Sequence, residues 1–275
     1  MMVFEIVYEN TVLQETAIGI ADTLFIHGVD STVTKVETNF NFNTDSTFII
    51  LGFQRYHQLP KSFIAVQTEQ DGSKTMTDTY LLKLGKAALV WDFSPKNVAK
   101  FKRQGLQNVF YFRTRIPLEI FVHGTVAFHR HFSRPITLTQ DIDVLFYGAK
   151  HRRRCAIQKI LNDNNIKTVF RYNDLFHDER ETLISRAKIV LNIHYFEYAS
   201  LETHRVEYLC ARGKCILSER STDPVLDQEY NNSIMFCNID NMVIEIRNLL
   251  ADPVKRRTME VNAQRTSFAR QFSSF

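Results

Sequence analysis

The most informative segment of the sequence is "ETHRVEYLCARGKCILSE", residues 202–219. Its first part has the apolar spacing of a helix that ends at Gly213, and "CILSE" follows at once as a short buried strand. His204 and Arg205 stand at the helix N-terminus, where the helix dipole disfavours positive charge, and Glu207 follows within a mostly apolar segment. Packing alone needs none of these three polar residues, so we expect this helix to begin at a binding site.

Outward from this stretch, short apolar segments alternate with helical patterns, which is typical of α/β layers around a mainly parallel sheet. Strands are expected at 3–9, 33–38, 47–53, 63–69, 87–93, 108–114, 143–148, 168–172, 188–196, 215–219 and 233–238. Helices are expected at 11–28, 97–105, 151–165, 178–187, over the opening stretch, and twice from residue 240 onward with a break near Asp252-Pro253.

The region 117–140 contains Pro117 and Pro135 and little periodicity, so it is expected to be a linker. The sequence therefore predicts two α/β domains with a cleft between them, residues 1–130 and residues 131–255. The last segment, 256–275, is predicted to be a helix that packs back on the first domain.

Composition excludes several functional classes. The net charge of +4 in 275 residues is too small for a general nucleic-acid binder, although it suffices for one polyanionic small molecule. No segment has the pattern of a signal peptide, and no apolar run approaches the length of a membrane helix. The cysteines lie in apolar surroundings without metal-binding spacing, which indicates buried thiols in a reducing compartment and predicts a cytoplasmic protein: Cys155, Cys210, Cys215 and Cys237.

A second candidate site is "FYGAKHRRRCAI", residues 146–157. A strand ends at Gly148, and a helix begins within the basic run Lys150–Arg154. Arginine forks match phosphate oxygens, whereas the sequence contains neither the glycine fingerprint of dinucleotide folds nor a P-loop. The alternative is an ordinary solvated helix start, but cations there oppose the helix dipole. We therefore expect an anion site.

Glu207 has two interpretations. A carboxylate one turn into a helix that faces a cleft can accept hydrogen bonds from vicinal ribose hydroxyls. Alternatively, Glu207 pairs at the surface with Arg205, Arg212 or Lys214.

The segments "THRVEYLCARGKCILSE", "ISRAKIVLNIHYF" and "LFYGAKHRRR" together resemble the donor-binding domain of GT-B glycosyltransferases of the group-1-like branch. The resemblance covers residues 143–255, and the N-terminal half fits as a Rossmann-like partner. It implies two Rossmann-like αβα domains that face each other across a cleft, with the acceptor on the first and the nucleotide sugar on the second. The whole chain also resembles small glycosyltransferases of large algal DNA viruses, of the chlorovirus β-xylosyltransferase type. That likeness implies transfer of a sugar such as xylose from a UDP-sugar to a glycan hydroxyl, in the host-cell cytoplasm.

The resemblance also assigns donor-binding residues. It implies that Glu207 binds the ribose and that Arg152, Arg153 and Arg205 bind the diphosphate, with His204 beside them. It also implies that the nucleotide base lies in the loop after the second or third strand of this domain. The residues so assigned are Gly148, Arg152, Arg153, Tyr172, Asn173, His204, Arg205 and Glu207.

Many retaining GT-B enzymes carry a second glutamate eight residues before the ribose-binding one, and that position here is Ala199. An inverting reaction is therefore expected, and it needs a general base to deprotonate the acceptor hydroxyl. In "FIAVQTEQDGSKTMTDTY", residues 63–80, Glu69 and Asp71 come just after an apolar strand in a loop that could supply this base, and Gly72 favours Asp71. The alternative is that this loop is an ordinary solvated turn. Asp92 and Glu9 follow other apolar strands, "AALVWD" and "FEIVYE", and are the next candidates for the base.

No metal or other cofactor is expected. Asp141 and Asp143 match the D-x-D pattern of metal-dependent transferases, but they precede their strand instead of following it. Three histidines could suggest zinc, but no completing ligand lies nearby: His123, His129 and His131. Three ring side chains could form the floor of an acceptor-sugar site: Tyr56, His57 and Trp91. Two other functions stay open, a GT-B-shaped nucleotide-sugar-binding protein without chemistry and a nucleotide-sugar epimerase.

Overall fold

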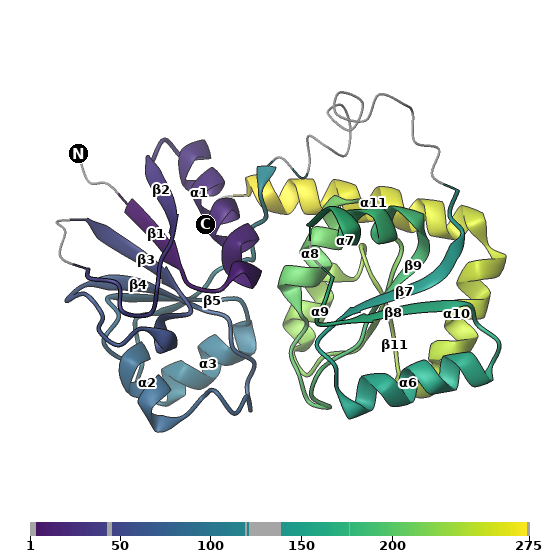
Figure 1. Ribbon diagram of the computed structural model, residues 1–275, viewed down its shortest axis with the longest axis horizontal. Coiled ribbons are helices and arrows are strands. Elements are labelled where there is room, and N and C mark those ends of the chain that lie inside the picture. The colour runs from purple at the N-terminus through teal and green to yellow at the C-terminus, as the bar shows by residue number, and fades with distance from the viewer. Residues whose placement is uncertain (1–3, 43–45, 119, 121–138, 176, 274–275) are drawn as a thin grey trace. The chain divides into compact units, whose positions relative to one another are not determined.

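The computed structural model describes residues 4–42, 46–118, 120, 139–175 and 177–273 (Figure 1). The chain forms two compact units, Met1–Leu118 with Gln271–Phe275, and Glu119–Arg270. The domain boundary expected at residue 130 lies outside the described residues. Within the described part of the chain, no helix has both the length and the apolar character that crossing a bilayer requires.

The first unit contains a six-stranded parallel sheet with the strand order β2-β1-β3-β4-β5-β6. Its strands are β1 (Phe4–Tyr8), β2 (Ser31–Lys35), β3 (Thr47–Leu51), β4 (Phe63–Gln67), β5 (Leu89–Asp92) and β6 (Val109–Tyr111). Its helices are α1 (Gln14–Ile26), α2 (Asp78–Leu84) and α3 (Pro95–Arg103). The C-terminal residues belong to this unit, where buried Arg115 donates hydrogen bonds to the carbonyl oxygens of Gln271 (3.1 Å) and Ser273 (3.3 Å).

The second unit contains a five-stranded parallel sheet with the order β11-β10-β9-β7-β8 (Figure 1). Its strands are β7 (Ile142–Gly148), β8 (Thr168–Tyr172), β9 (Ala187–Asn192), β10 (Ile216–Glu219) and β11 (Met235–Cys237). Its helices are α6 (Arg152–Asp163), α7 (His177–Arg186), α8 (Thr203–Ala211), α9 (Pro224–Tyr230), α10 (Met242–Ala251) and α11 (Pro253–Phe272).

The central strands read as continuous apolar runs because parallel sheets are covered by helices on both faces. In β3, Ile49 and Ile50 point to opposite faces, and both are fully buried, in two separate apolar clusters. In β9, Ile189, Val190 and Leu191 are likewise fully buried. The predicted fold class, two parallel-sheet α/β domains, is confirmed.

Two details differ from the sequence prediction. The strand expected at 188–196 ends at Asn192, because the carbonyl oxygen of Ile193 accepts hydrogen bonds from Arg154 instead of continuing the ladder. The short helices α2 and α9 were not predicted. Each begins at a side-chain cap, Thr77 for α2 and Asp223 for α9.

Candidate functional site

The strand order of the second sheet reverses at β7. β8 lies on one side of β7 and β9 lies on the other, although the chain visits them in succession. In open α/β sheets, ligands bind beyond the carboxyl ends of the strands at such a switch point. Gly148 ends β7 and Asn192 ends β9, so these two residues mark the position at which a ligand is expected.

Three arginines gather at this switch point: Arg153, Arg154 and Arg205. Arg154 is 2% exposed, and its guanidinium donates to the carbonyl oxygens of Ile193 (2.7 and 3.0 Å) and Ala149 (2.8 Å). These two carbonyls follow β9 and β7, respectively. The guanidinium therefore joins the ends of the two strands that bound the switch point.

Arg205, from the first turn of α8, approaches the same place from another element. Its Nη1 donates to Oδ1 of Asn192 at 2.9 Å. A Cβ atom at Gly148 would lie 2.7 Å from Nη2 of Arg205 and 3.4 Å from Nη1 of Arg154. A side chain at position 148 would force the Arg205 guanidinium to shift, and the backbone φ of +151° also favours glycine there.

Two carboxylates accompany the arginines. Arg153 binds both carboxylate oxygens of Glu219, which is 5% exposed. Oε2 of Glu202 lies 2.7 Å from Nδ1 of His194. Burial alone would raise the pKa of Glu202, but the charge of His194 and its hydrogen bond hold that pKa at about 2. Burial opposes the protonation of His194, yet Glu202 raises the pKa of this imidazole above its ordinary value.

The charges of this cluster do not balance. Three guanidinium groups face two carboxylates, and the raised pKa of His194 adds to the positive side. Burial, and then the charge of Arg205, lower the pKa of Arg154 to about 10, which shows that the two guanidinium groups repel each other. Arg154 remains charged at neutral pH. A bound anion would relieve this repulsion.

The start of α6 adds further positive charge. His151 is the N-cap residue, Arg152 is exposed, and the first turn contains no acidic residue. Asn173, which follows β8 with φ +64°, accepts a hydrogen bond at Oδ1 from the backbone N–H of Lys150 (3.2 Å). The structure thus brings Asn173 beside the basic run.

Tyr172 and His204, two other predicted donor-binding residues, have different surroundings. The Tyr172 hydroxyl donates to Oε1 of Gln158 (3.0 Å), and its ring packs against Phe146 and Phe170. Burial lowers the pKa of His204 to about 4, so His204 is neutral at neutral pH. His204 therefore adds no charge to the arginine cluster.

Glu207 is not part of this cluster in the structure. Its side chain is buried on α8, where the carboxylate accepts hydrogen bonds from Oγ of Ser267 (2.6 Å) and Nε of Arg270 (3.0 Å), both on α11. Arg205 lies two residues earlier on the helix, so the two side chains leave α8 on nearly opposite sides. Glu207 connects α8 to α11, and its assignment to the ribose stays a prediction.

This connection predicts a stability effect. Glu207→Gln would leave the buried guanidinium of Arg270 without its counter-charge, so the free energy of unfolding is expected to fall by about 3 kcal/mol. Urea unfolding followed by circular dichroism measures this change. Asp163→Asn is the matched control, because Asp163 pairs with Lys159 and both side chains are largely exposed, so this change should alter stability by less than about 1 kcal/mol. Unchanged stability of Glu207→Gln with lost nucleotide affinity would instead favour the ribose role.

In the first unit, the two candidate bases follow β4 but have different partners. Glu69 accepts a hydrogen bond from the hydroxyl of Ser73 (2.9 Å). Asp71 is paired with Lys100 and lies 3.8 Å from Lys96. The Glu69 carboxylate is thus contacted by a neutral hydroxyl and the Asp71 carboxylate by ammonium groups, so an acceptor hydroxyl would compete with weaker contacts at Glu69 than at Asp71.

The reserve acids are also engaged. Asp92, the last residue of β5, is fully buried and accepts hydrogen bonds from Nε2 of Gln67 and the backbone N–H of Ser94, both at 2.8 Å. Glu9, directly after β1, pairs with Arg55 at 2.7 Å.

The predicted acceptor-binding residues differ in their exposure to solvent. Tyr56 is fully buried in the core, with its ring edge-on to Phe42 at 5.5 Å between centroids, so its assignment as an exposed sugar platform is wrong. Trp91 is partly exposed and stacks on Phe112 at 4.4 Å, and His57 is exposed. The assignments of Trp91 and His57 stay predictions.

The D-x-D acids lie at the amino end of β7, at the opposite end of this strand from Gly148. Asp141 accepts two hydrogen bonds from Arg186 (2.6 and 2.8 Å), and Asp143 pairs with Lys188 (2.6 Å). Nowhere in the described ranges do three His, Cys, Asp or Glu side chains come together as a metal site. Outside those ranges lie the three histidines considered as zinc ligands: His123, His129 and His131.

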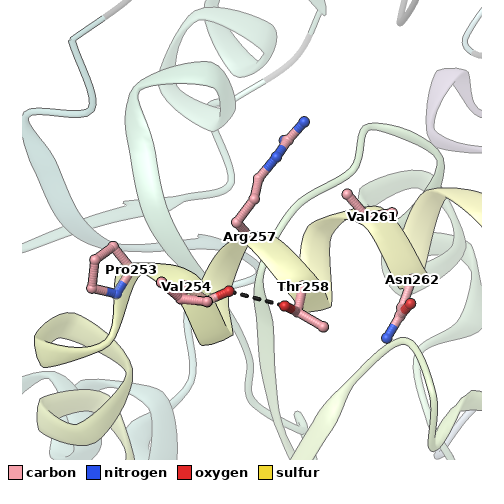
Figure 2. A pocket seen from close by; sticks show the side chains of 6 residues that line it. All are labelled: Pro253, Val254, Arg257, Thr258, Val261 and Asn262. Carbon is pink, nitrogen blue, oxygen red and sulfur yellow. Dashed lines mark hydrogen bonds between the residues drawn. The ribbon is translucent and has the colours of Figure 1, made fainter.

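A surface recess lies along α11, and Figure 2 shows the side chains that line it. Its lining comes from one helix alone: Pro253, Val254, Arg257, Thr258, Val261 and Asn262. None of the predicted site residues contributes to it, so it does not coincide with the switch point.

Five residues of the cluster were not predicted from the sequence: Arg154, Asn192, His194, Glu202 and Glu219. Arg154 belongs to the basic run already noted. Asn192 and Glu219 each end an apolar strand, and polar residues at the carboxyl ends of central strands were the available signal. For His194 and Glu202 no comparable signal exists, because the loop between β9 and α8 brings them together.

No protein-family model matches this sequence. A curated relative, an uncharacterized protein of Acanthamoeba polyphaga mimivirus, is 25% identical over 135 residues, 48% of this chain. The match spans only 15% of the length of that relative.

Solved structures resemble nearly the whole chain. Sucrose-phosphate synthase from Thermosynechococcus elongatus has a TM-score of 0.61 at 12% identity and covers 98% of this chain and 94% of its own. HepE from Anabaena, in complex with UDP, has a TM-score of 0.60 at 9% identity, over 98% and 95% of the two chains. A mutant of the T4 phage BGT, in complex with UDP-glucose, has a TM-score of 0.56 at 15% identity, also over 98% and 95%.

A putative UDP-N-acetylglucosamine 2-epimerase from Listeria monocytogenes also resembles the chain, with a TM-score of 0.50 at 10% identity over 97% and 94% of the two chains. At these identities the likeness concerns the fold alone. Sucrose-phosphate synthase, HepE and BGT are GT-B glycosyltransferases, and both units of this chain are parallel-sheet α/β domains. The chain therefore has the GT-B fold.

Proposed function

We propose that this protein is a glycosyltransferase that moves a sugar from a nucleoside-diphosphate sugar, with UDP as the nucleotide, to a glycan hydroxyl. The single observation that carries the proposal is the excess of arginine charge at the β7/β9 switch point of a GT-B fold. Two structural neighbours are complexes with UDP and with UDP-glucose, and both ligands contain the diphosphate that such a site fits.

The departing diphosphate carries the developing negative charge of the reaction. Arg153 and Arg205, with Arg152 at the start of α6, would stabilise it as fixed cations that need no reorganisation during the reaction. The acceptor hydroxyl must lose a proton as it attacks the anomeric carbon. Glu69 is the base we propose, with Asp71 second, because the described groups that donate to the Glu69 carboxylate, the side chains of Gln54 and Ser73, are neutral.

The proposed reaction inverts the anomeric centre. Ala199, where retaining relatives are expected to carry a glutamate, is 1% exposed and bears no acid. The transferred sugar is proposed to be xylose and the acceptor a glycan of the host cell, on the resemblance alone.

If fixed arginines stabilise the departing diphosphate in place of a divalent cation, sugar transfer should not depend on metal. Turnover with a UDP-sugar donor is expected to be unchanged after EDTA treatment, measured as release of UDP in the presence of acceptor. The two candidate metal ligands, Asp141 and Asp143, are already paired with cations. Abolition by EDTA with rescue by Mn²⁺ would contradict this prediction, and Asp141→Asn would then show whether the D-x-D pair is responsible.

A screen of nucleotide sugars by thermal unfolding tests the proposed function first. A ligand at 100 times its Kd adds about 2.7 kcal/mol of stability, so the true donor should raise the Tm clearly. Donors that bind are then incubated with and without glycan acceptors. Transfer supports the glycosyltransferase. Conversion of the donor without any acceptor would favour an epimerase, which the epimerase neighbour makes the second candidate, and binding without turnover would indicate a binding protein.

A further inference from the structure

The buried residues behind Arg205 form a continuous chain of hydrogen bonds. Arg205 donates to Oδ1 of Asn192 (2.9 Å), and Nδ2 of Asn192 donates to Oε2 of Glu202 (2.9 Å) and to Oγ of Ser218 (3.0 Å). Asn192 is fully buried, so water does not compete for these contacts. These hydrogen bonds connect the guanidinium of Arg205 at the switch point to the buried carboxylate of Glu202.

The chemistry of its two ends fixes the orientation of the amide between them. A guanidinium only donates and an ionised carboxylate only accepts. Asn192 must therefore turn its NH₂ group to Glu202 and its oxygen to Arg205. With the amide reversed, both contacts would be repulsive. Glu202 thus dictates which atom of Asn192 faces Arg205.

Glu202 is itself held in place. Its Oε2 also lies 2.7 Å from Nδ1 of His194, and its Oε1 lies 3.8 Å from Arg154. The other ring nitrogen of His194, Nε2, lies 3.2 Å from the carbonyl oxygen of Arg220, which can only accept. Both ring nitrogens of His194 therefore donate, as in the imidazolium form, and this cation keeps Glu202 ionised. His194 is 1% exposed, so the pair is shielded from solvent.

We infer that Glu202 is a positioning residue for the diphosphate site, because it orients the amide of Asn192 and thereby holds Arg205 at the position from which it contacts phosphate. The inference rests on the proposed function, since it assigns a role toward the diphosphate of the donor. Glu202 does not touch the ligand. It acts through Asn192, and Gly148 leaves the space into which Arg205 is directed.

A competing explanation predicts the opposite sign. If Glu202 only neutralised nearby cations, Glu202→Gln would raise the local positive potential and strengthen the binding of a diphosphate. If Glu202 positions Arg205, the same substitution weakens it, because glutamine can present either its oxygen or its NH₂ group and no longer dictates the amide orientation. The direction of the change in affinity therefore separates the two explanations.

The experiment compares UDP with uridine by isothermal titration calorimetry on wild type, Glu202→Gln and Asn192→Leu. Asn192→Leu cuts the chain of hydrogen bonds without changing any charge. Both variants are expected to weaken UDP binding about tenfold, roughly one charge-assisted hydrogen bond, and to leave uridine binding unchanged. The double variant should bind UDP like either single variant, because both substitutions break one chain of contacts.

Glu181→Gln is the matched control. Glu181 also pairs with an arginine of the second unit, Arg212 at 2.8 Å, but it does not take part in the hydrogen bonds that join Arg205, Asn192 and Glu202. It should leave UDP affinity unchanged. Circular dichroism checks the fold of each variant, and if Glu202→Gln does not fold, Asn192→Leu decides the matter alone. UDP affinity equal to or tighter than wild type in the folded variants, or equal losses for UDP and uridine, would overturn the inference. If the wild-type protein binds neither UDP nor uridine, the proposed function fails first.

Discussion

Glu69→Gln is expected to lower the turnover of sugar transfer by about 10²–10⁴-fold at saturating donor, the usual contribution of a general base. The amide keeps the shape of the side chain and can still contact Ser73, but it cannot accept the proton of the acceptor hydroxyl. UDP affinity should not change, because the proposed donor site belongs to the other unit. Initial rates of UDP release with donor and acceptor, together with calorimetry, measure the two quantities.

Asp71→Asn is the matched control in the same loop. It removes a carboxylate of similar exposure, but one that two lysines already hold, Lys96 and Lys100. A smaller loss than that of Glu69→Gln is expected. If Asp71→Asn shows the larger loss, the loop supplies the base through Asp71. If neither substitution lowers turnover, the base is elsewhere, and Asp92 and Glu9 are the next variants to make. NMR of the product should show the inverted anomeric configuration, and a preserved configuration would contradict direct displacement.

Arg205→Ala is expected to weaken UDP binding by about 10- to 100-fold while leaving uridine binding nearly unchanged. The lost group is a guanidinium at the switch point, and a hydrogen bond to a charged partner contributes about 1.5–3 kcal/mol. Uridine has no phosphate, so it should not sense the loss. Calorimetric titrations of the two ligands into wild type and variant provide the comparison.

Arg186→Ala provides the matched control for this variant. Arg186 is an arginine of the same unit, but it binds Asp141 at the amino end of β7. Its removal should leave the affinities of both ligands unchanged. Equal losses of UDP and uridine affinity in Arg205→Ala would show that Arg205 does not contact phosphate.

Much of the fold could be predicted from the sequence, because the strands of a covered parallel sheet are apolar along their whole length. β3 and β9 are examples, and their alternation with helical patterns indicated the α/β class. The end of β9 was not predicted, because Ile193, Tyr195 and Phe196 continue a largely apolar pattern beyond Asn192. A side chain from α6, Arg154, ends the strand by taking the carbonyl oxygen of Ile193.

Part of the candidate site could be predicted from a local rule about charge at helix ends. Cations at a helix N-terminus oppose the dipole, and this local rule pointed to Arg153 and Arg205 without knowledge of the fold. The role of Glu207 was harder to judge, because its partners Ser267 and Arg270 lie about sixty residues further along the chain. The assignment of Tyr56 to the acceptor site was wrong because the residue type does not distinguish between two roles. A ring can serve a core or a sugar platform, and only packing decides which.

The cluster around Glu202 lay beyond the reach of sequence patterns. Asn192, His194 and Glu202 lie within a stretch of eleven residues, but their contacts depend on the path of the loop that leads from β9 to α8. No periodicity describes such a loop. Only the paired donors and acceptors in the folded chain identify it as a buried polar network.

A crystal structure of the wild-type protein with UDP would show where the diphosphate binds. We expect the diphosphate to lie at the carboxyl end of β7, within hydrogen-bonding distance of the Arg205 guanidinium and beside Gly148, with no divalent ion between them. A diphosphate bound through a metal ion at Asp141 and Asp143, at the amino end of β7, would contradict it.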